Sequence, residues 1–453
     1  MKQINKNDDI QLEITGLTAE GSGIGRYEGM AVFVAGAAVG DVAEVHIIKV
    51  SKKYAVGKIN RLLTPSPDRT APACPVYSQC GGCVFSHMTY ESELEAKWSR
   101  VNDAVRRIGH LEITPEPIVG ADAPERYRNK SQLPVKIEGG VVSVGYYAQK
   151  SHRIINCTDC LLQPAAFKAG IEAFKTWAKS ARVSSYDETT GKGLIRHFYL
   201  RKAFGTNEIM ACVVINATAL PKEQLLVDLL REALPGLKSV VVNINMANTN
   251  VILGKTSKTV WGADFLTDEL LGMKFRISPN SFYQVNHDQT EKLYTIVKES
   301  AALTGSEVLA DIYCGAGTIG LTLAKDAKQL IGLEIVPQAV ENAKMNAEIN
   351  NIKNAHFFCC DAQEGAKELI EKSILPDVVI IDPPRKGADT ALIGAITEMH
   401  PKRIVYVSCD PATLARDLAL FREQGYETKA LTPVDLFPRT AHVETVAVLE
   451  RTL

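Results

Sequence analysis

Two short motifs near the end of the chain place reactive residue types directly after apolar runs. Val378-Val379-Ile380-Ile381 leads into Asp382-Pro383-Pro384-Arg385, and Ile404-Val405-Tyr406-Val407 leads into Ser408-Cys409-Asp410-Pro411. Such β-branched, apolar runs are typical of strands buried on both faces of a parallel sheet. Ligands of open α/β sheets bind beyond the carboxyl ends of the strands, so we expect Asp382 and Cys409 to face one cleft. A single cysteine after a strand is otherwise most often a small buried hydrophobic residue.

Strands and helices alternate through the C-terminal part of the chain, and this part must position both motifs. Repeated strand, helix, strand units predict a parallel, doubly wound sheet of the α/β, Rossmann-like class. We expect strands at 307–314, 329–335, 356–360, 378–381, 404–407 and 443–449, and helices at 318–327 and 337–350.

A glycine-rich loop follows the first of these strands. Asp311-Ile312-Tyr313-Cys314-Gly315-Ala316-Gly317-Thr318-Ile319-Gly320 contains the GxGxxG pattern, and Glu334 ends the next strand, where an acid can bind both hydroxyls of a ribose. This spacing permits a dinucleotide. Asp311, however, would repel a pyrophosphate and suits the ammonium group of S-adenosylmethionine, which carries no phosphate. Asp361 ends the third strand and could accept a hydrogen bond from an adenine amino group.

Residues 8–63 predict a small all-β module. Its strands alternate with period two, and glycines from Gly21 to Gly40 supply turns, which suits a five-stranded barrel. A run of cations with Tyr54 among them follows, and barrels of this kind bind single-stranded nucleic acid through basic grooves and stacking aromatics. A solvated surface is the alternative reading of the charges. The cations are Lys49, Lys52, Lys53, Lys58 and Arg61.

Three cysteines follow a proline-containing linker, at Cys74, Cys80 and Cys83. Four thiolates can hold either zinc or an iron–sulfur cluster, and the fourth would come from Cys157 or Cys160. In a large cytosolic chain, cysteines favour metal binding or catalysis over disulfides. Unliganded thiols are the alternative.

The middle of the chain predicts an α+β domain. Residues 92–111 form one amphipathic helix in which we expect no chemistry. The segments 126–130 and 196–202 mix cations with aromatics, which suits an RNA surface or solvated strand edges. Strands are expected at 133–137, 141–147, 194–200, 209–215 and 240–244, and helices at 164–181 and 222–234.

Composition limits the class of protein. The 453 residues carry a net charge of -1, so any basic surface must be local. The sequence shows neither the apolar core of a signal peptide nor an apolar run of about 18 residues. We therefore expect a cytoplasmic protein without membrane contact, and we further expect a monomer. The expected domains are 1–63, 64–270 and 271–453.

Together the motifs resemble the RNA (uracil-5-)-methyltransferase family, of the kind that acts on 23S rRNA. Besides 311–320 and the two motifs after the apolar runs, the resemblance rests on Ser281-Phe282-Tyr283-Gln284-Val285-Asn286 and His442-Val443-Glu444-Thr445. It covers nearly the whole chain. Residues 8–63 resemble the TRAM domain, and the cysteines resemble the 4Fe-4S site of the rRNA enzymes.

The resemblance implies a role for each matching residue. Cys409 would be the nucleophile and Glu444 the base. The segment Leu161-Leu162-Gln163-Pro164 after Cys160 favours this cysteine over Cys157 as the fourth cluster ligand. The metal ligands would then be Cys74, Cys80, Cys83 and Cys160. The implied S-adenosylmethionine residues are Gln284, Tyr313, Glu334 and Asp382, beside the loop and strand-end candidates Asp311, Gly315 and Asp361.

The implied chemistry explains these residue types. Carbon 5 of uracil becomes nucleophilic only when a thiolate adds to carbon 6, and a carboxylate must later remove the carbon 5 proton so that the thiol can leave. The thiolate is the reactive form, so we expect a lowered pKa for Cys409, with Arg385 as a candidate cause.

Other activities remain open on the sequence. RNA cytosine-5 enzymes carry a second cysteine where this chain has Arg385, and adenine-N6 enzymes place an aromatic residue after Asp-Pro-Pro and need no thiol. A uridine in the T-loop of tRNA is the second candidate substrate. An iron–sulfur redox protein and an inactive RNA-binding scaffold belong to different classes, and in both Cys409 and Glu444 would be incidental.

Overall fold

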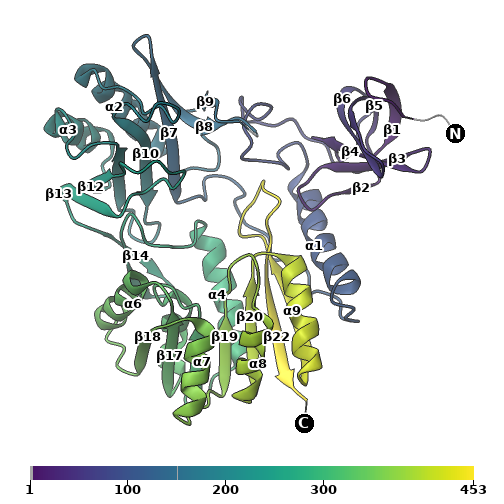
Figure 1. The fold of residues 1–453 in the computed structure, drawn as a ribbon, viewed down its shortest axis with the longest axis vertical. Coiled ribbons are helices and arrows are strands. Elements are labelled where there is room, and N and C mark those ends of the chain that lie inside the picture. Colours follow the sequence, from purple (N-terminus) through teal and green to yellow (C-terminus); the bar gives the residue numbers. More distant parts are fainter. Residues whose placement is uncertain (1–3, 150, 453) are drawn as a thin grey trace.

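The computed structural model describes residues 4–149 and 151–452. Residues 1–3 and 453, with which the first and last expected domains begin and end, lie outside this range. Three sheet-containing parts follow one another along the chain, and Figure 1 shows the N-terminal barrel and the central domain both lying above the C-terminal domain. Among the described helices none is long and apolar enough to cross a membrane.

The N-terminal part is a six-stranded sheet of order β1-β5-β6-β4-β3-β2 that curls around a small apolar core. A Cβ atom at Gly25 would lie 2.4 Å from the carbonyl oxygen of Glu13, so only glycine allows this close approach. The sheet has one strand more than the five expected. The strands are β1 (Asp9–Glu13), β2 (Gly16–Leu17), β3 (Gly23–Tyr27), β4 (Met30–Ala35), β5 (Val42–Val50) and β6 (Tyr54–Thr64).

Helix α1 (Tyr90–Arg107) connects the parts. The side chain of Thr89 caps its first turn by accepting a hydrogen bond from the backbone N–H of Ser92. Its buried residues Val101 and Val105 join one of the two cores of the C-terminal domain, and the helix packs against α9. The helix thus precedes the central domain in sequence but packs against the C-terminal one.

The central domain is a seven-stranded sheet of order β13-β12-β11-β10-β7-β8-β9 with α2 and α3 on one face. The strands expected at 141–147 and 209–215 are confirmed with those bounds. The elements are β7 (Lys130–Glu138), β8 (Val141–Tyr147), β9 (Ile154–Asn156), α2 (Ala166–Ala181), β10 (Ile195–Lys202), β11 (Ile209–Ile215), α3 (Glu223–Ala233), β12 (Leu237–Ile244) and β13 (Thr256–Gly262).

Both predictions for the segment 196–202, an RNA surface and a solvated strand edge, are wrong. This segment forms most of β10, which lies inside the sheet and is almost entirely buried. Arg196 donates to the carbonyl oxygens of Asn245, Ala247 and Thr249. Arg201 donates in the same way to two carbonyls of the 278–281 loop. Both guanidinium groups therefore bind backbone oxygens of the protein itself.

The C-terminal domain is the expected α/β sheet, of order β18-β17-β16-β19-β20-β22-β21. Strands β16 to β20 are parallel, while β22 pairs antiparallel with both β20 and β21. Strand β21 was not expected. The elements that build the sheet are β16 (Val308–Ile312), β17 (Gln329–Glu334), β18 (Ala355–Cys359), β19 (Val378–Ile381), β20 (Arg403–Ser408), β21 (Tyr426–Val434) and β22 (Glu444–Arg451).

Helices cover both faces of this sheet. Adjacent residues of β16 point to opposite cores, Leu309 to one and Ala310 to the other, as the alternation of side chains in a strand requires. A hairpin of β14 (Leu266–Leu270) and β15 (Met273–Ile277) joins this domain to the central one. The helices are α4 (His287–Ala301), α5 (Thr318–Leu323) with the 3-10 turn η1 (Ala324–Asp326), α6 (Pro337–Ile349), α7 (Ala362–Glu371), α8 (Thr390–Glu398) and α9 (Pro411–Glu423).

Candidate active site

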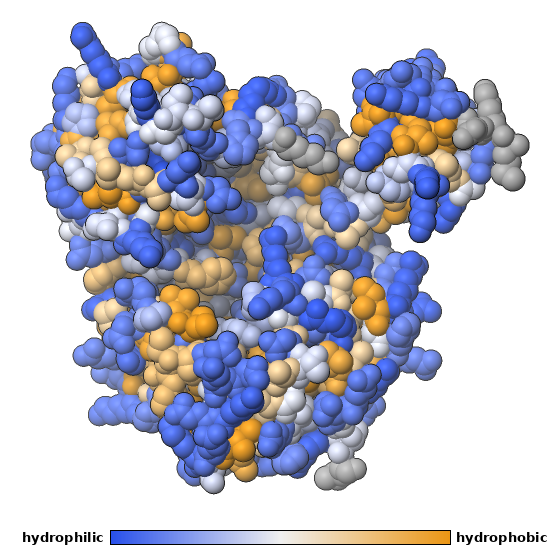
Figure 2. Space-filling view, viewed as in Figure 1, coloured by the Kyte–Doolittle hydropathy of each residue, from blue (hydrophilic) through white to orange (hydrophobic). Residues whose placement is uncertain are grey.

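Cys409 and Glu444 lie at the ends of two neighbouring strands. Cys409 directly follows β20, and Glu444 is the first residue of β22. Ser408 pairs with Thr445 across these strands, so both residues leave the sheet at the same edge. They line a cleft of about 1620 Å³ between the C-terminal and central domains. Figure 2 shows the molecule hollowed between these two parts.

Asp382 completes an acidic group in this cleft. It follows β19, the strand beside β20, and lines the same cavity. Burial, followed by the charge of Asp382, raises the pKa of Glu444 to about 8, and Arg385 acts in the opposite direction. Burial and the nearby Asp311 raise the pKa of Asp382 to about 7. Both carboxyl groups therefore bind a proton at a much higher pH than an exposed carboxyl group does.

The pKa of Cys409 is raised, which corrects the expectation of a lowered value. Burial raises the pKa of this thiol to about 11, with further contributions from Glu444 and Asp382. Arg385 lowers it, as expected from the sequence, but does not outweigh the others. Cys409 also lies beside the N-terminus of α9, which Asp410 caps, and a helix N-terminus favours a thiolate.

The glycine-rich loop between β16 and α5 turns sharply. Tyr313, Gly315 and Gly317 have φ angles of 68°, 56° and 76°, a region that non-glycine residues rarely adopt. Glu334 is fixed beside this loop, since its carboxylate accepts from the backbone N–H of Gly315 at 3.0 Å and of Val336 at 2.8 Å. Tyr313, Gly315 and Glu334 all line the cleft.

Three further expected cofactor residues occupy different positions. Gln284 lines the cleft, and its backbone oxygen accepts a hydrogen bond from the side chain of Asn129 at 2.8 Å. Asp361 lies on the wall and caps α7. Asp311 lies beneath the loop, 1% exposed, where one carboxyl oxygen accepts from the Gly320 N–H at 2.9 Å and the other has no partner among the described residues. Acids at the ends of successive strands suit a ligand with a ribose and cationic groups.

Five cysteines gather on another part of the same cleft wall. Burial and neighbouring thiols, Cys160 first among them, raise the pKa values of Cys83 and Cys157 to about 12. Within the described range, however, no three such side chains are arranged to hold a metal ion. Thiols are suitable metal donors, but the described side chains do not form a metal-binding group, so the expected metal site is not confirmed. The cysteines are Cys74, Cys80, Cys83, Cys157 and Cys160.

The central domain contributes a basic wall. In the segment 126–130, Arg128 and Lys130 line the cleft, while Arg126 donates to Asp159 beside the cysteines. Burial and the charges of Arg201 and Arg128 lower the pKa of Lys130 to about 8. Arg128, Lys130 and Gln132, each two residues from the next, all line the cleft, as the alternation of side chains in an extended segment requires.

Charged residues of α1 lie near this site and were not predicted from the sequence. Glu93, Lys97 and Arg100 are spaced by four and three residues and so share one helix face. That spacing was visible in the sequence, but only the fold shows that this face meets the loop before Glu444.

Comparison with known proteins identifies the family. The model of the tRNA (uracil-5-)-methyltransferase family matches residues 218–452, and the TRAM domain model matches residues 6–59. An uncharacterized RNA methyltransferase of Clostridium tetani is 46% identical over 446 residues, which cover 98% of this chain and 97% of that protein. A second, of Halalkalibacterium halodurans, is 43% identical over 449 residues, covering 99% and 98% respectively.

The solved structures include a relative of similar length. The tRNA (uracil-54, C5)-methyltransferase of Pyrococcus abyssi, in complex with S-adenosyl-L-homocysteine, is 28% identical with a TM-score of 0.79, covering 97% of this chain and 99% of that one. This chain therefore belongs to the tRNA (uracil-5-)-methyltransferase family and is an RNA (uracil-5-)-methyltransferase with an N-terminal TRAM domain.

Proposed function

We propose that the protein transfers a methyl group from S-adenosylmethionine to carbon 5 of a uridine in 23S rRNA, through a covalent adduct with Cys409. The observation that carries this proposal is the placement of Cys409, Glu444 and Asp382 at the ends of adjacent strands in one cleft. A thiol beside a carboxyl group is the pair that addition to carbon 6 and proton removal from carbon 5 require.

Each step can be assigned to a residue. The Cys409 thiolate forms a bond to carbon 6 of the uracil. The resulting enolate takes the methyl group at carbon 5, the bond between that methyl group and the sulfonium breaks, and S-adenosylhomocysteine is the leaving group. Glu444 then accepts the carbon 5 proton, the bond between sulfur and carbon 6 breaks, and the electron pair returns to Cys409. Asp382 follows the strand on the other side of β20 from Glu444 and would hold the ring and the turn.

The methyl donor would lie along the ends of β16, β17 and β18. Glu334 is oriented by two backbone N–H groups and would accept from ribose hydroxyls, while Asp361 would accept from the adenine amino group. Gln284, Tyr313 and Gly315 would border the ligand, and the buried Asp311 would act on its cationic end from below. S-adenosylmethionine supplies the methyl group as a sulfonium.

RNA would enter over the basic wall. Arg128, Lys130 and Arg385 line the cleft and suit phosphate groups. The cleft lies at the sheet edge, so the target base must leave its stack to reach Cys409. A ribosomal RNA substrate places the enzyme in the cytoplasm, and we expect it to act as a monomer.

The target RNA is tested by mapping nucleosides after deletion of the gene. We expect loss of 5-methyluridine from 23S rRNA, and the purified enzyme should restore it in vitro. Loss of the modification only from tRNA would establish the second candidate, which the family model and the tRNA enzyme of Pyrococcus abyssi favour. Unchanged nucleosides in both RNAs would contradict the proposed function.

We also propose that Cys74, Cys80, Cys83 and Cys160 hold a 4Fe-4S cluster, with zinc as the alternative. The mutual effect of these thiols on their pKa values supports their proximity, and Cys160 contributes to the shifts of both Cys80 and Cys83. Anaerobically purified protein should contain iron and sulfide and absorb broadly in the blue. Cys80→Ala should remove this absorption, and colourless protein with one zinc ion would overturn the assignment.

A further inference from the structure

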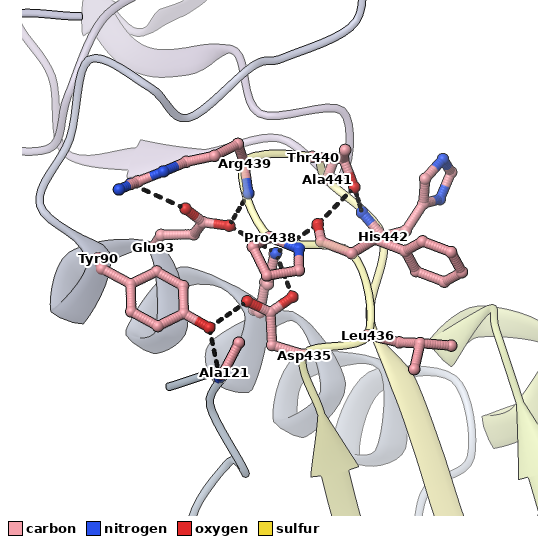
Figure 3. A network of polar contacts seen from close by, with 12 residues as sticks. Tyr90, Glu93, Ala121, Asp435, Leu436, Pro438, Arg439, Thr440, Ala441 and His442 are labelled. Carbon is pink, nitrogen blue, oxygen red and sulfur yellow. Dashed lines mark hydrogen bonds and ion pairs between the residues drawn. The ribbon is translucent and has the colours of Figure 1, made fainter. Parts of the chain in front are cut away.

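The loop 435–442 joins β21 to β22 and ends just before Glu444. Helix α1 directs a set of polar side chains at it, and Figure 3 shows Tyr90 and Glu93 pointing towards Asp435 and Arg439. Tyr90 donates to Asp435 at 2.7 Å, and Glu93 accepts from the backbone N–H of Arg439 at 2.6 Å. The side chains of α1 thus add contacts to a loop that backbone hydrogen bonds to Val84 and Val119 also hold.

Lys97 is the centre of this network. Its ammonium lies 2.7 Å from Glu93 and 2.7 Å from Asp435, and it also donates to the carbonyl oxygen of Phe437 at 3.2 Å. Lys97 is 1% exposed and both carboxylates are fully buried. Buried charges are costly to desolvate and add little stability over an apolar core, so their benefit here is a fixed geometry.

Arg100 extends the same helix face to both halves of the reactive pair. One guanidinium nitrogen donates to the carbonyl oxygen of Ala441 at 2.7 Å, in the loop before Glu444. A second lies 3.6 Å from the carboxylate of Asp410, the residue after Cys409. One side chain therefore links the turn of Cys409 to the loop that leads to Glu444.

We propose that Arg100, supported by Lys97, is a positioning residue that holds Cys409 and Glu444 in their reactive geometry. The inference rests on the proposed function, because it assumes that these two residues act on the same base. Helix α1, which lies outside the methyltransferase sheet, would thus help to position the two reactive residues. Small displacements of reacting groups cost much of the rate, so loss of the link should slow the reaction without abolishing binding.

The first test needs no substrate. Hydrogen exchange of the 436–446 amides is compared in the parent protein, Arg100→Ala and the control Arg107→Ala, which removes an exposed arginine from the same helix. We expect the amides to exchange about tenfold faster in Arg100→Ala only. Lys97→Met serves as a second variant if it folds. If the 436–446 amides exchange at the same rate in Arg100→Ala as in the parent protein, the proposal is overturned, whatever the substrate is.

The second test measures the reaction itself. In Arg100→Ala we expect kcat to fall about 10- to 100-fold, KM for S-adenosylmethionine and RNA to stay within about twofold, and Arg100→Lys to recover part of the loss. Arg107→Ala should match the parent. Faster exchange with an unchanged kcat would make Arg100 merely structural and would overturn the positioning role. A parent enzyme that methylates no uridine would contradict the proposed function, and the exchange test would still decide whether Arg100 holds the loop.

Discussion

Cys409, Glu444 and Asp382 line one corner of the cleft, where burial and neighbouring charges set their protonation. Burial raises the pKa values of all three groups, and neighbouring carboxylates raise them further: Asp382 acts on Glu444 and Cys409, and Asp311 acts on Asp382. Arg385 opposes this for Cys409 and Glu444. The free enzyme therefore keeps its nucleophile as a thiol at neutral pH, and a cationic methyl donor would favour ionisation of the thiol and the acids.

The raised pKa of Glu444 predicts a pH dependence. Glu444 accepts a proton only when it is ionised, and its pKa is about 8. The single-turnover rate at which methylated RNA is released from Cys409 should therefore rise as the pH increases from 7 to 9. Arg385→Gln removes the charge that lowers the pKa values of Glu444 and Cys409, so the midpoint should move to higher pH. Lys386→Gln, the matched control at the next position, should leave the midpoint in place. A midpoint that moves down in Arg385→Gln would contradict this account.

At the scale of elements, the start of α5 lies so close to the sheet that it requires glycine. A Cβ atom at Gly320 would lie 2.7 Å from a carboxyl oxygen of Asp311 and 2.9 Å from Leu330. Gly320→Ala should therefore lower the free energy of unfolding by about 1–3 kcal/mol and weaken S-adenosylmethionine binding. Urea denaturation and ligand titration measure these effects.

Gly394 in α8 provides the control for this substitution. It is a helical glycine with open space around its Cβ position, so Gly394→Ala should stabilise the protein by about 0.4–1 kcal/mol without changing ligand affinity. If the two substitutions changed the free energy of unfolding and the affinity for S-adenosylmethionine equally, the close contact between α5 and the strands would not determine the conformation of the glycine-rich loop.

Apolar pattern predicted most of the catalytic sheet, because its central strands are buried on both faces. The strand at 378–381 has the expected bounds, and the bounds of β16, β17 and β20 were expected within two residues. The pattern failed in β10, where Arg196 and Arg201 read as surface residues. Their partners are carbonyl groups of distant loops, and local sequence carries no information about them.

At the scale of the whole molecule, the barrel is joined to the catalytic domain through a small apolar cluster. Ala38 of the barrel, Phe85 of the cysteine segment and Ala441 of the loop before Glu444 pack together. Asp41 adds a buried ion pair to Arg69 at 2.7 Å. The sequence pattern predicted that Asp382 and Cys409 face one cleft, and the family resemblance implied that Glu444 acts with Cys409. Neither the apolar cluster nor the contacts of α1 could be predicted, because both depend on residues more than 300 positions apart.

The barrel lysines predict a salt-dependent contribution to RNA binding. Lys49, Lys52 and Lys53 are exposed, and replacing all three by glutamine should weaken RNA binding. The slope of log K against log salt should become shallower by roughly one for each phosphate group that the variant no longer neutralises. Affinity for S-adenosylmethionine should not change. A binding titration at several salt concentrations measures the slope.

Three exposed lysines of the C-terminal domain, at the end of its sheet that faces away from the cleft, serve as the matched control for the barrel lysines. They lie near the amino ends of β17 and β18, away from the cleft, and the same triple replacement there should leave the slope unchanged. They are Lys325, Lys328 and Lys353. Equal slopes for the two triple variants would show that the barrel does not bind the RNA backbone.

The central claim is that Cys409 and Glu444 serve successive steps on one uracil, and trapping the intermediate tests it most directly. Glu444→Gln keeps the size of the side chain but cannot accept the carbon 5 proton, so methyl transfer proceeds and elimination stalls. Incubated with RNA and labelled S-adenosylmethionine, this variant should accumulate a methylated protein–RNA adduct that survives denaturing electrophoresis. The adduct should be absent when Cys409→Ala is added. Turnover of Glu444→Gln near the parent rate without an adduct would contradict the account.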